Sequence, residues 1–174
     1  AGLARRRRAR LVAVGAMAGF AFASVAGSGL LASLIKNLYG RVRPEHLAGD
    51  GVFELHGLAF RAKYAAFPSG HATTAGATAM VLALIFPRWR GPILVAGGIV
   101  ALTRVALGAH FFSDVAAGFA LGACVTLVIA HRLALRGVAF RPLADGRLVP
   151  RGAAGPAGWF DLLAGLLAAR RGSA

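Results

Sequence analysis

Acidic residues and cysteines are both scarce in this chain of 174 residues. Six Asp and Glu residues accompany 20 Lys and Arg residues, which gives a formal net charge of +14. Charged residues of both signs make up only 15% of the chain, which is too few for an ordinary soluble domain. Cys124 is the only cysteine, so the sequence excludes an internal disulfide and a cysteine-based metal cluster.

Hydrophobic residues are abundant. They make up 57% of the chain, and the mean hydropathy is +0.67, which indicates an integral membrane protein. Glycines within the apolar stretches are expected to let transmembrane helices pack closely, with Gly15, Gly19, Gly27 and Gly29 as examples. The basic residues cluster at the ends of apolar stretches rather than in a folded patch, so nucleic-acid binding is not expected.

Four apolar stretches predict an all-α, polytopic membrane helix bundle with about four transmembrane helices. The predicted spans cover approximately residues 11–35, 71–87, 92–108 and 111–130, and they form a catalytic membrane bundle within residues 1–131. A polar outer loop, residues 36–70, follows the first span. Residues 132–174 are basic and punctuated by Pro and Gly, so we expect a solvent-exposed cytoplasmic tail, with a short interfacial helix at 159–169.

The distribution of positive charge predicts the orientation of the bundle. A cytoplasmic N-terminus puts 14 of the 20 Lys and Arg residues on the cytoplasmic side. The other six lie within or near three polar motifs on the outer face; they are Lys36, Arg41, Arg43, Arg61, Lys63 and Arg104. The motifs are Lys-x6-Arg-Pro at residues 36–44, Pro-Ser-Gly-His at 68–71 and Arg-x5-His-x3-Asp at 104–114. Ionisable groups beside apolar spans indicate a functional site.

The cations of these motifs favour an anionic ligand with several oxygens. Lys36, Arg43 and Arg104 have few acidic partners nearby in the sequence, and guanidinium and ammonium groups both suit phosphate. Ser69 and Gly70 precede an apolar helix whose first N–H groups would add to an anion site. The alternatives are that Lys36 extends to lipid headgroups and that Ser69 is an ordinary helix N-cap.

Two histidines suggest a division of catalytic roles. His110 and Asp114 are spaced i, i+4, so the carboxylate could orient the imidazole for attack on phosphorus. His71, at the predicted helix start, suits proton donation to the leaving oxygen and later activation of water. This chemistry requires no metal and no cofactor. A metal hydrolase using His71, His110 and Asp114 is a less favoured alternative, because the three cations would repel a metal ion.

These three motifs closely resemble the signature of the type 2 phosphatidate phosphatase superfamily, which includes membrane lipid phosphatases, bacterial acid phosphatases and vanadium haloperoxidases. The resemblance implies that Lys36, Arg43 and Arg104 bind phosphate with assistance from Ser69 and Gly70. It also implies His110 as the nucleophile, Asp114 as its orienting partner and His71 as the general acid. Membrane members usually have six spans, so this chain is expected to hold the C-terminal four of a six-helix core.

The resemblance implies a bacterial inner-membrane lipid phosphatase that acts at the outer, periplasmic leaflet through a phosphohistidine. Expected substrates are phospholipids such as phosphatidylglycerophosphate or phosphatidate, polyprenyl diphosphates, or the 1-phosphate of lipid A. Two alternatives stay open: a lipid phosphotransferase that uses the same site, and a non-catalytic protein that binds lipid phosphates.

Overall fold

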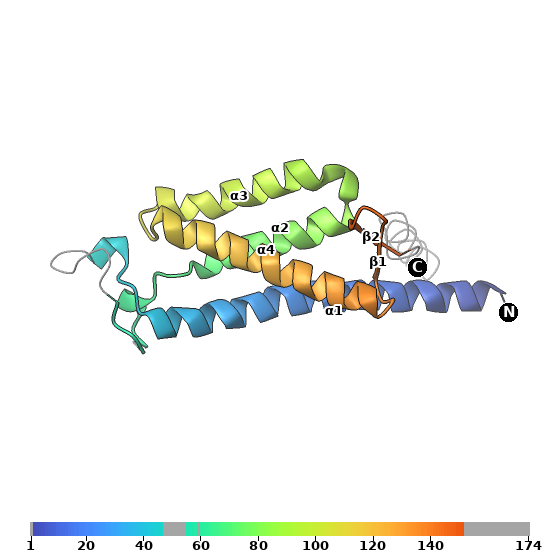
Figure 1. Ribbon diagram of the computed structural model, residues 1–174, viewed down its shortest axis with the longest axis horizontal. Helices are drawn as coiled ribbons and strands as arrows, with labels where there is room; N and C mark the ends of the chain where they lie inside the picture. The colour runs from blue at the N-terminus through green and yellow to red at the C-terminus, as the bar shows by residue number, and fades with distance from the viewer. Residues whose placement is uncertain (1, 47–54, 59, 152–174) are drawn as a thin grey trace, which may run out of the picture.

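The computed structural model describes residues 2–46, 55–58 and 60–151, and the predicted helix at 159–169 lies outside these residues. Four long helices form the bundle in Figure 1: α1 (Gly2–Tyr39), α2 (Gly70–Ile85), α3 (Arg90–Ala106) and α4 (Phe112–Leu135). Short 3-10 helices occupy the connections, at Pro44–His46, Ala62–Tyr64 and Pro87–Trp89. A mostly helical bundle, as expected from the apolar stretches, is therefore confirmed, although the chain is not all-helical.

Two helices of the described part of the chain are long and apolar enough to cross a membrane. They are α1 from Leu11 to Tyr39 and α4. At 16 and 17 residues, α2 and α3 are shorter than the roughly 20 residues that a perpendicular crossing requires. Four membrane crossings therefore stay a prediction.

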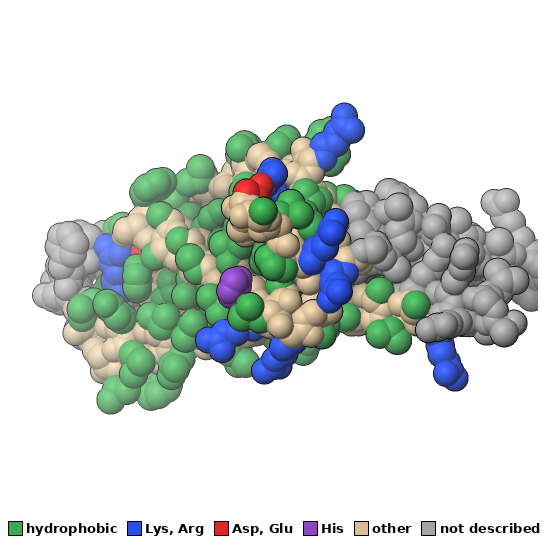
Figure 2. Space-filling model, turned by 45° about the vertical axis from the view of Figure 1, so that its right-hand side comes forward, with side chains coloured by type: hydrophobic (Ala, Val, Ile, Leu, Met, Phe, Trp, Pro, Cys, Tyr) green, Lys and Arg blue, Asp and Glu red, His purple; other side chains and the backbone are tan. Residues whose placement is uncertain are grey.

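Many large apolar side chains point outward, while several small and polar side chains are buried between the helices. Phe22 and Leu30 are more than 70% exposed, and Ile99 is 61% exposed. Thr73 and Thr126 are fully buried, and each hydroxyl donates to a backbone carbonyl one turn earlier. Figure 2 shows hydrophobic side chains over much of one face. Such a surface would be unfavourable in water and suits a hydrocarbon environment.

Glycines bring α2 close to α3 and α4. A Cβ on Gly118 would lie 2.5 Å from the carbonyl oxygen of Ser69, and one on Gly97 would lie 2.5 Å from the Cβ of Ala79. Gly76 and Gly122 are equally crowded by backbone of the facing helix. The glycines expected to serve this purpose do not do so within the described residues, where a Cβ at Gly15, Gly19, Gly27 or Gly29 would meet no atom within 4 Å.

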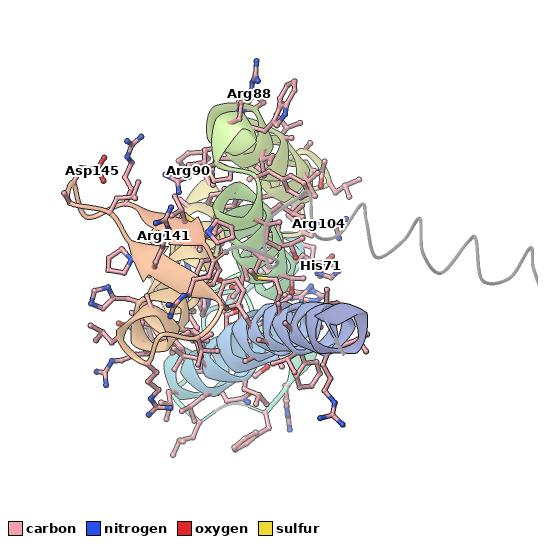
Figure 3. The ribbon with its side chains drawn as sticks, turned by 90° about the vertical axis from the view of Figure 1, so that its right-hand side faces the viewer. His71, Arg88, Arg90, Arg104, Arg141 and Asp145 are labelled. Carbon is pink, nitrogen blue, oxygen red and sulfur yellow. The ribbon has the colours of Figure 1, made fainter. Side chains whose placement is uncertain are left out.

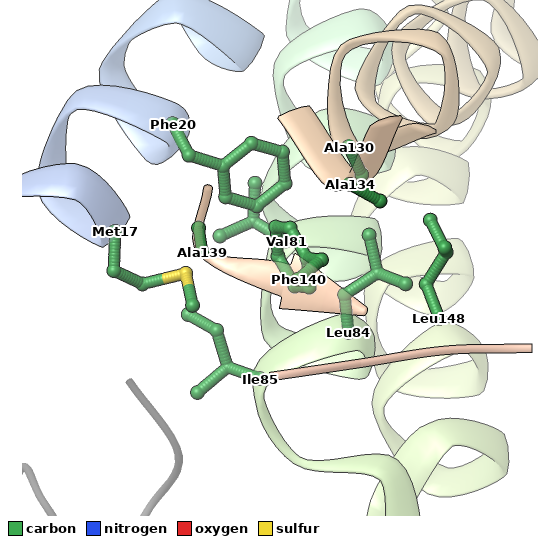
Figure 4. Close-up of a cluster of buried hydrophobic side chains, with 10 residues drawn as sticks. All are labelled: Met17, Phe20, Val81, Leu84, Ile85, Ala130, Ala134, Ala139, Phe140 and Leu148. Atoms are coloured by element: carbon green, nitrogen blue, oxygen red, sulfur yellow. The ribbon is translucent and has the colours of Figure 1, made fainter. Parts of the chain in front are cut away.

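A β-hairpin after α4 closes one end of the bundle. Its strands, β1 (Phe140–Pro142) and β2 (Leu148–Pro150), pair antiparallel. Phe140 is fully buried, and its ring meets that of Phe20 edge-on at a centroid distance of 4.9 Å. Figure 4 shows the surrounding cluster: Met17, Phe20, Val81, Leu84, Ile85, Ala130, Ala134, Ala139, Phe140 and Leu148. The first part of the segment predicted as a solvent-exposed tail is therefore part of the core.

Polar contacts also fix the hairpin to the bundle. The Nη2 of Arg90 donates to the carbonyl oxygen of Leu148 at 2.6 Å, and its Nε donates to that of Ala83 at 3.2 Å. In the hairpin turn, Asp145 accepts hydrogen bonds from the backbone N–H and the Nε of Arg147. These bonds, chiefly the one from the backbone, hold the pKa of the Asp145 carboxyl below its usual value.

Replacing Phe140 with alanine is expected to destabilise the protein by about 3–5 kcal/mol, because it leaves a cavity where the aromatic ring contacts α1. Thermal unfolding in detergent would measure the loss. The control is Leu135→Ala, since Leu135 is 70% exposed at the end of α4. Equal losses in the two variants would contradict the packing of the hairpin against the bundle.

Candidate functional site

The three sequence motifs meet at one end of the bundle. There the last turns of α1 and α3, which carry Lys36 and Arg104, lie near the first turns of α2 and α4. Residues of all three motifs therefore approach one another. His71 lies within electrostatic reach of four groups: Arg104, His110, Lys36 and Arg43. Figure 3 shows His71 and Arg104 on the same side of the bundle. The geometry therefore joins residues that are up to 78 positions apart in the sequence, from Lys36 to Asp114.

Ser69 and Gly70 shape the start of α2. Ser69 is fully buried and caps the helix, since its Oγ accepts from the N–H of Ala72 at 3.4 Å. Its backbone N–H donates to the carbonyl oxygen of Asp114 at 3.0 Å, which ties α2 to α4. The N-cap alternative is thus confirmed for Ser69, and a role of its hydroxyl group in binding phosphate stays a prediction.

Lys36 lies beside this helix start, and Arg43 is within electrostatic reach of Lys36. A Cβ added to Gly70 would lie 3.6 Å from the Nζ of Lys36, an ordinary van der Waals distance, so the ammonium group lies directly beside the start of α2. Arg43 is held by its backbone N–H, which donates to the carbonyl oxygen of Lys63 at 3.0 Å. The Nε of Arg43 is buried and has no hydrogen-bond partner within the described residues. A buried donor without a partner is ready to bind an anionic oxygen.

His110 and Asp114 are brought together, but they are not hydrogen-bonded. His110 is 5% exposed and Asp114 is fully buried. The Nδ1 of His110 lies 3.7 Å from the Oδ2 of Asp114, which is longer than a hydrogen bond, and this nitrogen has no other partner in the described part of the chain. The same Oδ2 accepts from the N–H of Phe111 at 3.0 Å. Catalytic hydrogen bonds are often long before substrate binds and shorten in the complex.

Arg41 is the residue of this site that the sequence motifs did not identify. Its Nη1 lies 2.6 Å from the Oδ1 of Asp114 and 2.8 Å from the Oγ of Ser113. The guanidinium carbon also lies 4.5 Å from the centre of the Phe111 ring. Arg41 was expected on the outer face as one of six cations, with no role of its own. Arg41 and Asp114 are 73 positions apart, so no local sequence pattern predicts their contact. The only signal in the sequence was an additional cation within the first motif.

The loop between α1 and α2 positions Arg41. Gly40 ends α1 with a φ of +62°, and a Cβ there would collide with the backbone of His56. The carbonyl oxygen of Arg41 accepts from the N–H of Ala66 at 3.1 Å. The backbone of Arg41 is therefore fixed on both sides, which directs its side chain towards α4.

A cavity of about 1160 Å³ opens between α1, α2 and α3. Lys36, Gly70, His71 and Arg104 lie along one end of its lining. His110, Arg43 and Asp114 do not line it. The expected site residues therefore divide into a group that lines the cavity and a group, which includes His110, that is not part of the lining.

Comparisons with known proteins agree with the motifs. The family model described as the PAP2 superfamily matches residues 15–137. A lipid A 1-phosphatase of Rhizobium etli is 39% identical over 141 residues, which cover 81% of this chain and 61% of that protein. A decaprenylphosphoryl-5-phosphoribose phosphatase of Mycobacterium tuberculosis is 39% identical over 131 residues, covering 73% of this chain and 63% of that protein.

A second lipid A 1-phosphatase, from Rhizobium johnstonii, is also 39% identical over 141 residues and is covered over 58% of its length. The chain thus spans about three fifths of the curated relatives that it matches. The names of these relatives and the two long apolar helices together indicate a membrane protein.

Proposed function

Because this chain belongs to the PAP2 superfamily, we propose that it is a membrane phosphatase that hydrolyses a lipid phosphate or diphosphate. The observation that carries this proposal is the gathering of Lys36, Arg43 and Arg104 around His71, with His110 in electrostatic reach of the same imidazole. Among the described residues, only Arg43 of these three cations lies within 4 Å of a carboxylate, that of Glu45 at 3.8 Å. The three cations therefore suit a phosphate dianion, and the two histidines provide a nucleophile and a proton carrier.

The first step transfers the phosphoryl group to His110. Its Nδ1 faces Asp114, so the lone pair of Nε2 is the one that attacks phosphorus. The P–Nε2 bond forms while the bond from phosphorus to the lipid oxygen breaks, and His71 donates its proton to that oxygen. Asp114 stabilises the positive imidazolium ring of the phosphohistidine. Lys36, Arg43 and Arg104 stabilise the charge on the phosphoryl oxygens.

The second step releases phosphate. His71, now neutral, takes a proton from water as the water oxygen attacks phosphorus. The P–Nε2 bond then breaks, inorganic phosphate leaves, and His110 returns to its neutral form. The step needs no metal ion, and the cations around His71 disfavour one.

Arg41 acts on this mechanism through Asp114. One carboxylate oxygen is fixed by Arg41 and the other by the N–H of Phe111, which leaves the second oxygen directed at His110. Arg41 is therefore a positioning residue. It also neutralises a carboxylate that would otherwise be buried without a charged partner.

The substrate is a membrane lipid with an exposed phosphate. The names of the relatives support a lipid A or a polyprenyl phosphate compound as the substrate class. The positive-inside arrangement supports a bacterial inner-membrane location, with four crossings and the site facing the periplasm.

The proposal predicts phosphate release from at least one lipid phosphate in the presence of excess chelator. The panel contains lipid A, decaprenyl phosphate, undecaprenyl diphosphate, phosphatidylglycerophosphate and phosphatidate in detergent micelles. Loss of all activity on chelation would contradict the metal-independent mechanism. Transfer of the phosphoryl group to a second lipid instead of water would identify a phosphotransferase, and binding without release would identify a non-catalytic protein.

A further inference from the structure

A second cavity, of about 390 Å³, lies at the other end of the bundle from the candidate site. Its lining comes from the last turns of α2 and α4, the first turns of α3 and the hairpin turn at residues 146–148. The two cavities share none of their described lining residues. Leu84, in the second cavity, follows His71 by 13 positions, which is about 20 Å along α2. The second cavity is therefore separate from the groups that would bind the substrate phosphate.

Arg90 supplies a fixed cation to this cavity. Its Nε and Nη2 donate to the carbonyl oxygens of Ala83 and Leu148, which also belong to the lining. Both acceptors are neutral, and Arg90 forms no ion pair with a carboxylate in the described part of the chain. Figure 3 shows Arg90 next to the hairpin that carries Arg141 and Asp145. The guanidinium group is held in place with its charge uncompensated, which suits a phosphate group.

Arg147 adds a second guanidinium group from the hairpin turn. Its Nε forms an ion pair with Asp145 at 2.5 Å, so one acidic residue balances part of the positive charge. The segments that make up this end of the bundle, 86–90 and 131–151, hold seven arginines and no acidic residue besides Asp145. This excess of positive charge around the cavity favours an anionic ligand.

Apolar side chains make up most of the remaining lining, and part of it is exposed on the surface expected to face hydrocarbon. Leu94 follows Arg90 by one turn of α3, and Leu127 lines the cavity from α4. Leu127 is 40% exposed and the adjacent Val128 is 57% exposed. Trp89 is also exposed, as is typical of a Trp at the membrane–water interface. The cavity thus combines cations near the interface with an apolar side that lipid can reach.

We propose that this cavity binds the headgroup of an anionic phospholipid, with its phosphate held by Arg90 and Arg147. The lipid comes from the leaflet that borders the hairpin, which is the cytoplasmic leaflet in the proposed orientation. It is a bound component and not the substrate, because the cavity is remote from His71. A volume of about 390 Å³ falls within the range of small-ligand sites, roughly 300–1,000 Å³. Basic pockets between transmembrane helices are general sites for anionic headgroups.

The test is the Kd for phosphatidylglycerol, an anionic phospholipid, measured by native mass spectrometry on the full chain in nonionic detergent. Arg147→Gln is expected to raise this Kd by about tenfold, the factor for loss of one charge-assisted hydrogen bond. Arg90→Gln should raise it too, but Arg147→Gln is the decisive variant because it keeps the bonds from Arg90 to the hairpin and α2.

Arg141→Gln is the matched control. Arg141 is an exposed arginine of the same hairpin and is not part of the described lining, so the same loss of charge should leave the Kd nearly unchanged. An equal effect of Arg147→Gln and Arg141→Gln, or no effect of either, would overturn the proposal. The measurement does not involve phosphate release, so its outcome is independent of the proposed function.

Three further arms identify the ligand and its place. Phosphatidylcholine, whose headgroup carries its own cation, should bind more weakly, and equal affinity for the two lipids would overturn the proposal. Glycerol phosphate, a soluble anion, should bind more weakly as well, since it lacks the apolar contacts; tight binding would assign the cavity to a soluble ligand instead. Arg104→Gln removes a cation from the first cavity and should leave the Kd for phosphatidylglycerol unchanged. A loss in Arg104→Gln without a loss in Arg147→Gln would place the lipid in the first cavity and overturn the proposal.

Discussion

Replacing His110 with alanine is expected to lower phosphate release from a lipid phosphate by about 1,000-fold or more, because the covalent route loses its nucleophile. The remaining rate would come from the cations, which still bind the phosphate. The measurement is steady-state phosphate release by purified protein in detergent. Binding of inorganic phosphate, which the cations hold without a covalent bond, should persist in the variant, which would show that the site is intact.

His131→Ala is the control for this variant. His131 is an exposed histidine in α4, 21 positions after His110, so its replacement should leave the rate within about twofold, as for other surface changes. A rate for His110→Ala close to that of the unaltered protein would contradict the assignment of His110 as nucleophile.

Replacing Arg41 with glutamine is expected to lower kcat by about 10- to 100-fold, the range typical for loss of a group that orients a reactive residue. Without the guanidinium group, the buried carboxylate of Asp114 loses the ion pair at 2.6 Å and can turn away from His110. KM should change little, because Arg41 contacts Asp114 and Ser113 instead of the cavity. Arg41→Lys should restore part of the rate, since an ammonium group keeps the charge.

Two controls separate positioning from a loss of folded protein. The stoichiometry of vanadate binding counts intact sites, so kcat can be expressed per site. The double variant Arg41→Gln with Asp114→Asn should be no slower than Asp114→Asn alone, because both changes act through the same carboxylate. Multiplicative losses in the double variant, or a KM increase as large as the fall in kcat, would contradict this role. Arg61→Gln, an exposed change in the same loop, should have no effect.

The helices could be predicted from sequence because each one coincides with an apolar stretch of consecutive residues, and the hydropathy of a stretch does not depend on distant contacts. The predicted spans at 71–87 and 92–108 differ by one to two residues at each end from α2 and α3. The hairpin could not be predicted, since its strands have three residues each and lie in a basic segment rich in Pro and Gly. Burial of Phe140 depends on Phe20 in α1, 120 positions earlier, and no local pattern encodes that contact.

The packing glycines show the same limit. Gly27 and Gly118 are both glycines within apolar helices, but only Gly118 meets a neighbouring backbone. Which face of a helix is covered depends on how the helices are arranged, and the chain offers glycines on covered and open faces alike.

Two signals in the sequence made part of the site predictable: the spacing of residues within each motif and the distribution of charge along the chain. The i, i+4 spacing of His110 and Asp114 placed them together, and charge-derived topology gathered the three motifs on one face. Two features depended on contacts between distant segments: the ion pair of Arg41 with Asp114, and the cavity lined together by residues of α1, α2 and α3.

A rapid chemical quench tests the central claim, that His110 forms a covalent phosphoenzyme, most directly. The protein is mixed with lipid phosphate labelled with ³²P, quenched in base within the first turnover and digested. Mass spectrometry then locates the label. We expect a base-stable, acid-labile phosphoramidate on the peptide that contains His110, absent from His110→Ala. Phosphate release with no protein-bound label, or with label on a different residue, would contradict the account.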